Sequence, residues 1–305
     1  MNNTHVLHAA AVAWLAPAVI LWGANSGAAQ AGAGADRQAA AKKVLDEAAS
    51  RPTPKAADGR PDLSGTWAAP AGAPRRETNV DLYDSKKGPA GTPGNPVLKL
   101  SQQQEQAGNI SNVARRKANS AARPDYKPEF RNKWEYLFDN AAKQDPSYKC
   151  MPMGVPRMGP PREIVQTPKA VYLLYAGLVS TPNLYRIVPT DGRSRDKGAD
   201  PMSNGQSLGR WEGDTLVVDT VNFDDSTWLD GDGSFHSDAL HVVERFTRKG
   251  DTLVWDVTAE DSKVFAKPFK LPARTLVRAP DGVHAEQDFG CVEMDQELLQ
   301  TTERH

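Results

Sequence analysis

The chain has 305 residues, of which 39% are hydrophobic, and this length accommodates one large domain or two small ones. Lys and Arg total 37 and Asp and Glu total 38, so the formal net charge is −1 at pH 7. Nucleic acids and anionic membranes require a basic surface, and this balance therefore excludes both as expected partners. The 24 glycines and 23 prolines predict many turns.

The N-terminus has the pattern of a secretory signal peptide that covers residues 1–31. An apolar run at residues 9–22 is too short to span a bilayer, and small residues lead from it to Ala29-Gln30-Ala31. We expect cleavage after Ala31, a periplasmic or secreted mature protein, and no membrane anchor after cleavage.

Beyond the signal peptide, residues 32–61 are predicted to form a helix and a linker. Ala, Lys and Glu dominate Asp36–Ser50, which favours a short helix, and prolines break the pattern in Arg51–Pro61. The remaining residues, 62–305, are predicted to form one β-barrel domain with a helical insertion at about residues 100–145.

Two stretches of the insertion, Leu100–Ser120 and Glu129–Lys143, have helical patterns. In the second, large apolar side chains recur at helical spacing, at Phe130, Trp134, Leu137 and Phe138. Such a stripe is far more often a packing face than a ligand site, so we interpret it as the surface that docks on the sheet.

Extended segments dominate from residue 162 onward, after a first one at Gly65-Thr66-Trp67. The clearest is Ser207–Phe223, a β-hairpin with a tight turn at Glu212-Gly213-Asp214. The sequence G-D-T-L-V-x-D recurs at residues 250–256, so a second hairpin repeats the same in/out pattern. In lipocalin-like barrels a Gly-x-Trp opens the first strand, and we expect its Trp to plug one end of the barrel.

Alternation along the two repeats places their apolar side chains on one common face. This face is formed by Leu216, Val218 and Thr220 in the first repeat and by Leu253, Trp255 and Val257 in the second. With about eight to ten strands, the sheet has enough strands to close on itself. The predicted fold is all-β, an antiparallel lipocalin-like barrel with an N-terminal helical and irregular extension, and a β-sandwich is the alternative.

The two cysteines, Cys150 and Cys291, fit an exported protein. We interpret them as one disulfide that ties the start of the folded region to its end. Neither has C-x-x-C spacing or a nearby His partner, so a metal or redox role is not favoured.

Five motifs together resemble a large family of exported, largely uncharacterised proteins from environmental bacteria. They are C-x-P-x-G-x-P-R at 150–157, P-T-D-G-R at 189–193, G-R-W-E-G-D-T-L-V-V-D-T at 209–220, W-L-D at 228–230 and H-S-D-x-L-x-V-V-E-R at 236–245. The resemblance implies a lipocalin-like barrel in the periplasm and brings no reaction with it. The chain departs from the family at Ser194-Arg195-Asp196, where relatives tend to carry a His.

The densest polar cluster supplies the candidate catalytic residues. His236, Asp238 and His241 form H-x-D-x-x-H, and Glu244 and Arg245 follow. In the functional interpretation, His236 is a general acid/base, Asp238 fixes its tautomer and Arg245 stabilises negative charge. In the structural interpretation, which we weigh more heavily, Asp238 caps a turn and Glu244 pairs with Arg245 or a neighbour to close a barrel end.

Further candidate ligand-binding residues are Arg157, Arg193, Trp211, Trp228 and Glu244. The two arginines would hold an anionic or enolate oxygen, and a Trp at the barrel mouth would contact an aromatic ligand. For both tryptophans a place in the core or at the barrel plug is the stronger interpretation.

The sequence predicts neither a cofactor nor a bound metal. H-x-D-x-x-H is not a spacing that recurs in zinc enzymes, and the Asp230-x-Asp232-x-Ser234 loop lacks the Gly and the final Glu of a calcium loop. The sequence contains no G-x-S-x-G elbow, P-loop or dinucleotide glycine fingerprint.

The leading functional hypothesis is binding of a small, largely apolar or aromatic molecule inside the barrel or at its mouth. The alternative is a cofactor-independent isomerase, lyase or hydrolase that uses His236 and Asp238 on a small carbonyl or aromatic substrate. A third hypothesis is a structural or envelope interaction protein with a filled barrel. The sequence leaves the oligomeric state open.

Overall fold

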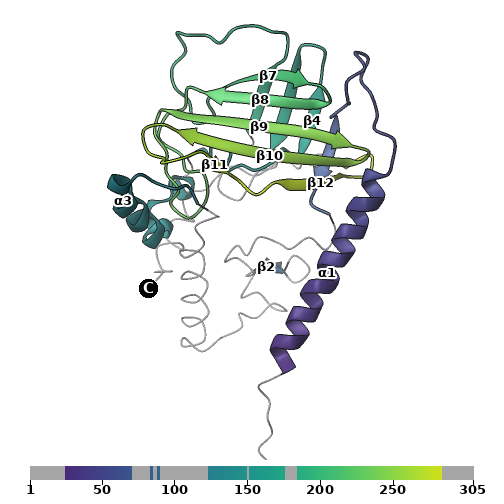
Figure 1. The fold of residues 1–305 in the computed structure, drawn as a ribbon, viewed down its shortest axis with the longest axis horizontal. Coiled ribbons are helices and arrows are strands. Elements are labelled where there is room, and N and C mark those ends of the chain that lie inside the picture. The colour runs from purple at the N-terminus through teal and green to yellow at the C-terminus, as the bar shows by residue number, and fades with distance from the viewer. Residues whose placement is uncertain are drawn as a thin grey trace, which may run out of the picture.

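The molecule is organised around one antiparallel sheet that curls into a nearly closed barrel (Figure 1). The computed structural model describes residues 25–70, 83–84, 88–89, 123–149, 151–175 and 184–283. The strands of the barrel wall are β1 (Gly65–Ala68), β4 (Glu163–Gln166), β5 (Ala170–Tyr175), β6 (Leu184–Pro189), β7 (Gln206–Glu212), β8 (Thr215–Val221), β9 (Leu240–Lys249), β10 (Thr252–Asp261) and β12 (Arg274–Arg278).

The order of these strands round the barrel is β6-β5-β4-β1-β12-β10-β9-β8-β7, and each neighbouring pair is antiparallel. A short strand, β11 (Phe269–Lys270), pairs with β10 outside this path, and β2 (Tyr83–Asp84) pairs with β3 (Gly88–Pro89) in a separate ribbon. The arrangement confirms the predicted all-β antiparallel barrel over the β-sandwich.

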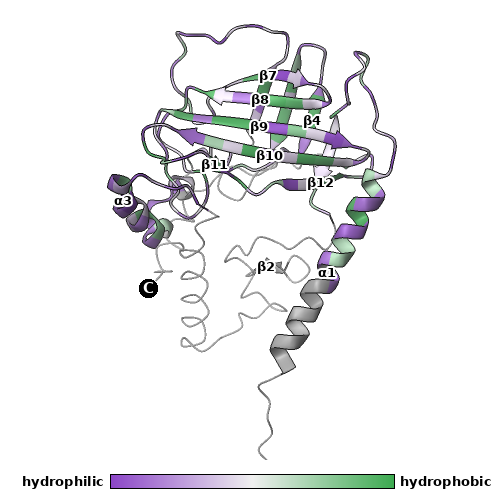
Figure 2. Ribbon diagram, in the orientation of Figure 1, coloured by the Kyte–Doolittle hydropathy of each residue, from purple (hydrophilic) through white to green (hydrophobic). Residues whose placement is uncertain are grey.

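The two predicted hairpins form the front of the barrel. β7 pairs with β8 around Gly213, and β9 pairs with β10 around Gly250, and both glycines have a positive φ, of 58° and 57°. Burial alternates along β9, so Val242, Glu244 and Phe246 point inward and the residues between them point outward. Figure 2 shows a hydrophilic segment in the middle of β9 between hydrophobic ones.

The barrel closes between β6 and β7, and this seam differs from every other strand contact. An odd number of alternating strands brings two parallel strands together where the ring closes, and the path has nine. Among the described residues no backbone pairing joins β6 to β7. A Cβ on Gly209 of β7 would lie 2.9 Å from Val188 Cγ1 and 2.8 Å from Thr190 Cγ2, so glycine allows the close approach.

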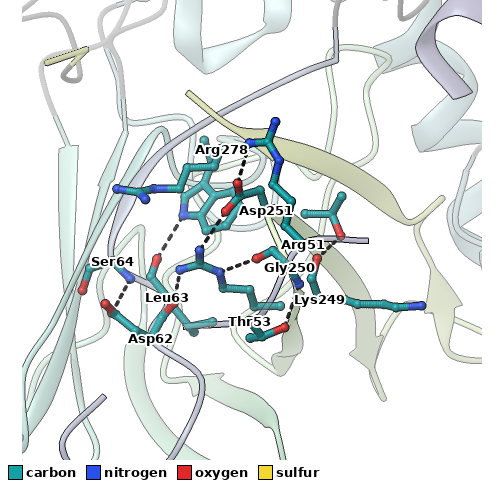
Figure 3. A network of polar contacts seen from close by, with 12 residues as sticks. Arg51, Thr53, Asp62, Leu63, Ser64, Lys249, Gly250, Asp251 and Arg278 are labelled. Carbon is teal, nitrogen blue, oxygen red and sulfur yellow. Dashed lines mark hydrogen bonds and ion pairs between the residues drawn. The ribbon is translucent and has the colours of Figure 1, made fainter. Parts of the chain in front are cut away.

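One end of the barrel is closed by Trp67 and Arg248. Trp67 is buried and donates from Nε1 to the Leu63 carbonyl at 3.0 Å, and the Arg248 guanidinium lies 5.2 Å from the centre of its ring. Arg248 also donates to the Gly250 carbonyl at 2.8 Å and pairs with Asp251 at 3.2 Å. Figure 3 shows Gly250 and Asp251 among the residues that form this network of polar contacts. The expected plug by the Gly-x-Trp tryptophan is thus present.

The N-terminal helix, α1 (Asn25–Ala49), ends at this closed end of the barrel (Figure 1). The backbone N–H of Asp251 donates to the Ala48 carbonyl at 2.9 Å, and Arg51 pairs with Asp251 at 2.8 Å. The helix predicted at Asp36–Ser50 therefore begins earlier than expected and runs through the expected cleavage site after Ala31. Residues 1–24 of the predicted signal peptide lie outside the described residues.

The opposite end of the barrel is covered by α3 (Pro128–Asp139), which is followed by α4 (Ala141–Gln144) and the 3-10 turn η2 (Pro146–Lys149). Trp134 and Phe138 of the predicted stripe are buried. Just before the helix, Tyr126 stacks on Phe235 with ring centres 4.8 Å apart and meets Phe265 edge-on at 5.4 Å. The predicted helix at Leu100–Ser120 lies outside the described part of the chain.

Candidate functional site

A buried polar cluster crosses the inside of the barrel, and its centre is the side chain of Arg186 on β6. Arg186 Nη1 donates to Glu244 Oε2 on β9 at 2.6 Å and to the Tyr175 hydroxyl on β5 at 3.0 Å. Arg186 Nη2 donates to Ser207 Oγ on β7 at 2.8 Å and to Thr220 Oγ1 on β8 at 3.0 Å. The guanidinium therefore bridges the seam between β6 and β7.

Glu244 is held from two sides. Its Oε2 accepts from Arg186, and its Oε1 accepts from the Trp255 indole N–H on β10 at 3.0 Å. We call the six interacting residues the Arg186 cluster, and they are Tyr175, Arg186, Ser207, Thr220, Glu244 and Trp255.

The alternation of each strand places these polar side chains inside. Arg186 lies in phase with buried Val188, and Glu244 lies opposite Val218 of β8 and Val257 of β10. The other inward side chains around the cluster are apolar and include Val188, Val218, Val242, Phe246 and Val257. The cluster is thus a polar band in an otherwise apolar interior.

Electrostatics fix the protonation states within the cluster. Burial lowers the pKa of Arg186, but Glu244 and Tyr175, through their charge interactions and hydrogen bonds, together outweigh this effect and raise the pKa above its ordinary value. Burial raises the pKa of Tyr175 well above its ordinary value. Arg186 therefore stays cationic and the Tyr175 hydroxyl keeps its proton.

The Arg186 cluster leaves one strong donor unused. Arg186 is only 5% exposed, and its Nε–H is buried without an acceptor among the described residues. A ligand oxygen is the kind of group that would accept a hydrogen bond from this Nε–H.

His236 is buried and fully engaged by its neighbours. Its Nδ1 lies 2.9 Å from the Ser237 carbonyl, which can only accept, so Nδ1 carries the proton. Its Nε2 then accepts from the Thr227 hydroxyl at 2.8 Å. Burial lowers the pKa of His236, and the ring is therefore neutral at pH 7.

The other candidate catalytic residues lie apart from His236. Asp238 is exposed and pairs with Lys263 at 2.5 Å, which lowers the pKa of its carboxyl group. His241 and Arg245 point outward from β9, where His241 contacts Asp219 at 3.1 Å and Arg245 pairs with Glu212 at 2.8 Å. The structure therefore does not bring His236, Asp238 and Arg245 together, because strand alternation and the intervening turn direct them to different sides.

The two candidate arginines outside β9 also have local partners. Arg157 is half-buried and binds the Asp145 carboxylate through two hydrogen bonds, of 2.7 and 2.5 Å. Arg193 is exposed and chelates Asp191 two residues before it, which lowers the pKa of that carboxyl group to about 2. Arg195 pairs with Asp219.

The candidate tryptophans occupy packing positions. Trp228 is buried and forms an isolated bridge with Phe235, and Trp211 is partly buried with the Arg60 guanidinium 5.6 Å from the centre of its ring. Cys150 and Cys291, the predicted disulfide partners, lie outside the described residues.

One residue of the C-x-P-x-G-x-P-R motif packs directly against the partner of His236. Gly154 has a φ of 73°, and a Cβ there would lie 2.5 Å from Thr227 Oγ1. The motif glycine is needed for this close approach, which holds the Thr227 hydroxyl against the His236 ring.

Of the predicted site residues, only Glu244 belongs to the Arg186 cluster. Arg186 and Tyr175 were not predicted as site residues. A signal for Arg186 was present in the sequence, because it is the single charged residue in the otherwise apolar strand at residues 184–189 and lies two positions before Val188.

Comparison of the chain with protein-family models, with curated proteins and with solved structures gave no match. Within the described ranges, no group of three or more His, Cys, Asp or Glu side chains is arranged to hold a metal ion. The helices in those ranges include none that is long and apolar enough to cross a membrane. The fold and the cluster together define the class, a β-barrel with a charged, hydrogen-bonded band in its interior.

Proposed function

We propose that this protein binds a small, largely apolar or aromatic molecule inside its barrel, with one polar group of the ligand at the Arg186 cluster. The observation that carries the proposal is the buried Arg186 Nε–H, for which the described residues supply no acceptor. Apolar walls with a few convergent polar groups are typical of small-molecule sites. A barrel of about this strand number has room for one small ligand.

Stability alone gives a weak reason for the cluster. Moving two charges out of water is costly, and apolar side chains of similar volume often leave stability unchanged or higher. The Arg186–Glu244 pair is almost completely buried, with side chains 4% and 1% exposed. A role in recognition accounts for a charged pair at this position.

The enzymatic alternative has less support in the geometry. The nearest hydrogen-bonding partners of His236 are Thr227 and Ser237, and the Asp238 carboxylate contacts Lys263 instead. We therefore propose a structural role for His236, at the end of the barrel covered by α3.

We further propose that the protein is exported, as its N-terminal pattern indicates. Processing after Ala31 would leave Gly32 as the first residue of the mature chain. N-terminal sequencing of protein recovered from the periplasm tests this, and an unprocessed cytoplasmic chain would contradict it.

A thermal-shift screen against neutral apolar, aromatic and carbonyl compounds tests the binding function. A ligand that binds only the folded state at one hundred times its Kd stabilises that state by about 2.7 kcal/mol, so hits are expected to raise Tm clearly. The same hits are expected to shift His236→Gln equally. A screen in which no compound raises Tm would contradict the proposal and favour a filled barrel.

A further inference from the structure

We infer that the ligand of the barrel is uncharged and presents a carbonyl oxygen to Arg186, an inference that rests on the proposed binding function. The guanidinium uses four of its N–H groups for Glu244, Tyr175, Ser207 and Thr220, and the fifth, at Nε, lacks an acceptor among the described residues. The site therefore has an unsatisfied hydrogen-bond donor, the Arg186 Nε–H, and a ligand with an acceptor would satisfy it.

The charge balance of the interior argues against an anionic ligand. Arg186 contributes one positive charge, and Glu244, 2.6 Å away, already neutralises it. A second inward-pointing cation, Arg248 of β9, is engaged by Asp251 and by the backbone carbonyls of Asp62 and Gly250. A carboxylate ligand would therefore bring an unpaired charge into a buried, apolar space.

The charge balance and the donors also argue against a hydrocarbon or a cationic ligand. A hydrocarbon would leave the Arg186 Nε–H unsatisfied, and an unsatisfied buried donor carries a desolvation penalty. A cation would lie next to Arg186 while Glu244 is already occupied on both oxygens, by Arg186 and by Trp255. The carbonyl oxygen of a neutral ketone, aldehyde or ester accepts from the Arg186 Nε–H without adding charge.

Three probes of nearly equal size separate these cases. They are 4-butylacetophenone, 1-butyl-4-ethylbenzene and 4-butylbenzoate, which present a neutral carbonyl, no acceptor and a carboxylate on the same apolar body. Equilibrium dialysis against the purified full chain gives their Kd values. We expect the ketone to bind about tenfold more tightly than the hydrocarbon, because one satisfied hydrogen bond is worth about that factor. We expect it also to bind more tightly than the carboxylate, because the carboxylate brings an unpaired charge into the interior.

A pair of double variants assigns the preference to the Arg186 cluster. Arg186→Met with Glu244→Met removes both charges together and leaves no uncompensated charge, so the variant is expected to fold and to bind ketone and hydrocarbon equally. Arg245→Met with Glu212→Met removes an ion pair of 2.8 Å on the outer face of the barrel and is the matched control. The control is expected to keep the preference for the ketone.

The outcomes are distinguishable. Equal binding of ketone and hydrocarbon by the unaltered protein would overturn the inference while leaving the binding function standing, and so would tightest binding of the carboxylate. A ketone preference that survives in the Arg186→Met, Glu244→Met variant would overturn the role of the cluster. Failure of all three probes to bind up to their solubility limits would overturn the binding function and the inference together.

Discussion

Arg186 and Glu244 hold opposite charges inside the barrel, where neither side chain reaches water. Each is the main partner of the other, and their shortest contact is 2.6 Å. Removing one of them leaves an uncompensated buried charge, whereas removing both leaves none.

This difference leads to a first prediction at the scale of the residue. Arg186→Met and Glu244→Met are each expected to lower the free energy of unfolding by about 3–5 kcal/mol, and the double variant is expected to recover most of that loss. Urea denaturation of the three variants measures the coupling. Arg245→Met, one position along β9 but on the outer face, should cost at most about 1 kcal/mol. A double variant as unstable as the sum of the single ones would contradict this description.

His236 makes stability depend on pH. Burial holds its pKa in the folded protein below the ordinary value of 6.5, although the Ser237 carbonyl and Asp261 oppose this effect. The unfolded chain therefore takes up a proton at His236 before the folded protein does. Stability is expected to fall as the pH drops below about 6.5 and to level off below the depressed pKa of the folded protein.

His236→Gln is expected to remove this contribution, whose slope is at most about 1.4 kcal/mol per pH unit. Unfolding free energies between pH 7.5 and 5 in the unaltered protein, His236→Gln and His241→Gln give the comparison. His241, half-buried on the outer face, serves as the control. An unchanged pH slope in His236→Gln would show that His236 is not buried in its neutral form.

At the scale of the element, the close packing of β6 against β7 requires a glycine at position 209. Gly209→Ala would place a Cβ within 2.9 Å of Val188 and Thr190, so β6 must move away from β7. We expect a loss of about 1–3 kcal/mol in the free energy of unfolding. Gly198→Ala is the control, because a Cβ there meets only Asp196 Oδ1 at an ordinary 3.5 Å. Equal stability of the two variants would contradict the close packing of the seam.

The hairpins were predictable from the sequence because their pairing is local. Gly213 and Gly250 mark the turns, and the recurrence of Leu216, Val218 and Thr220 at every second position of β8 gives the inward face. The neighbours of β1 were not predictable, because β1 pairs with β4 and β12, far along the chain. Alternation tells which face of a strand is buried and carries no information about which strand lies beside it.

At the scale of the whole molecule, closure of the barrel creates the candidate site. Tyr175 and Arg186 lie on the paired strands β5 and β6, and the curvature of the sheet brings Glu244 of β9 to Arg186. Glu244 was a predicted site residue, but its expected partner was Arg245 or a neighbour. Successive residues of a strand point to opposite faces, so Arg245 lies outside and the true partner is 58 residues away.

The turn before β9 explains why the H-x-D-x-x-H pattern did not form a site. His236 precedes β9 and contacts Thr227, whereas Asp238 lies in the exposed turn and His241 on the outer wall. Closeness in sequence indicated a cluster, and the turn before β9 separates its members.

The central claim is that a ligand inside the barrel accepts a hydrogen bond from Arg186. An NMR spectrum of the arginine Nε–H groups, recorded while 4-butylacetophenone is added, tests it most directly. The resonance that is absent in the Arg186→Met, Glu244→Met variant is assigned to Arg186. We expect that resonance to shift and to exchange more slowly with water as the ketone binds, while that of Arg245 stays unchanged. Binding of the ketone with no change at the Arg186 resonance would contradict the claim.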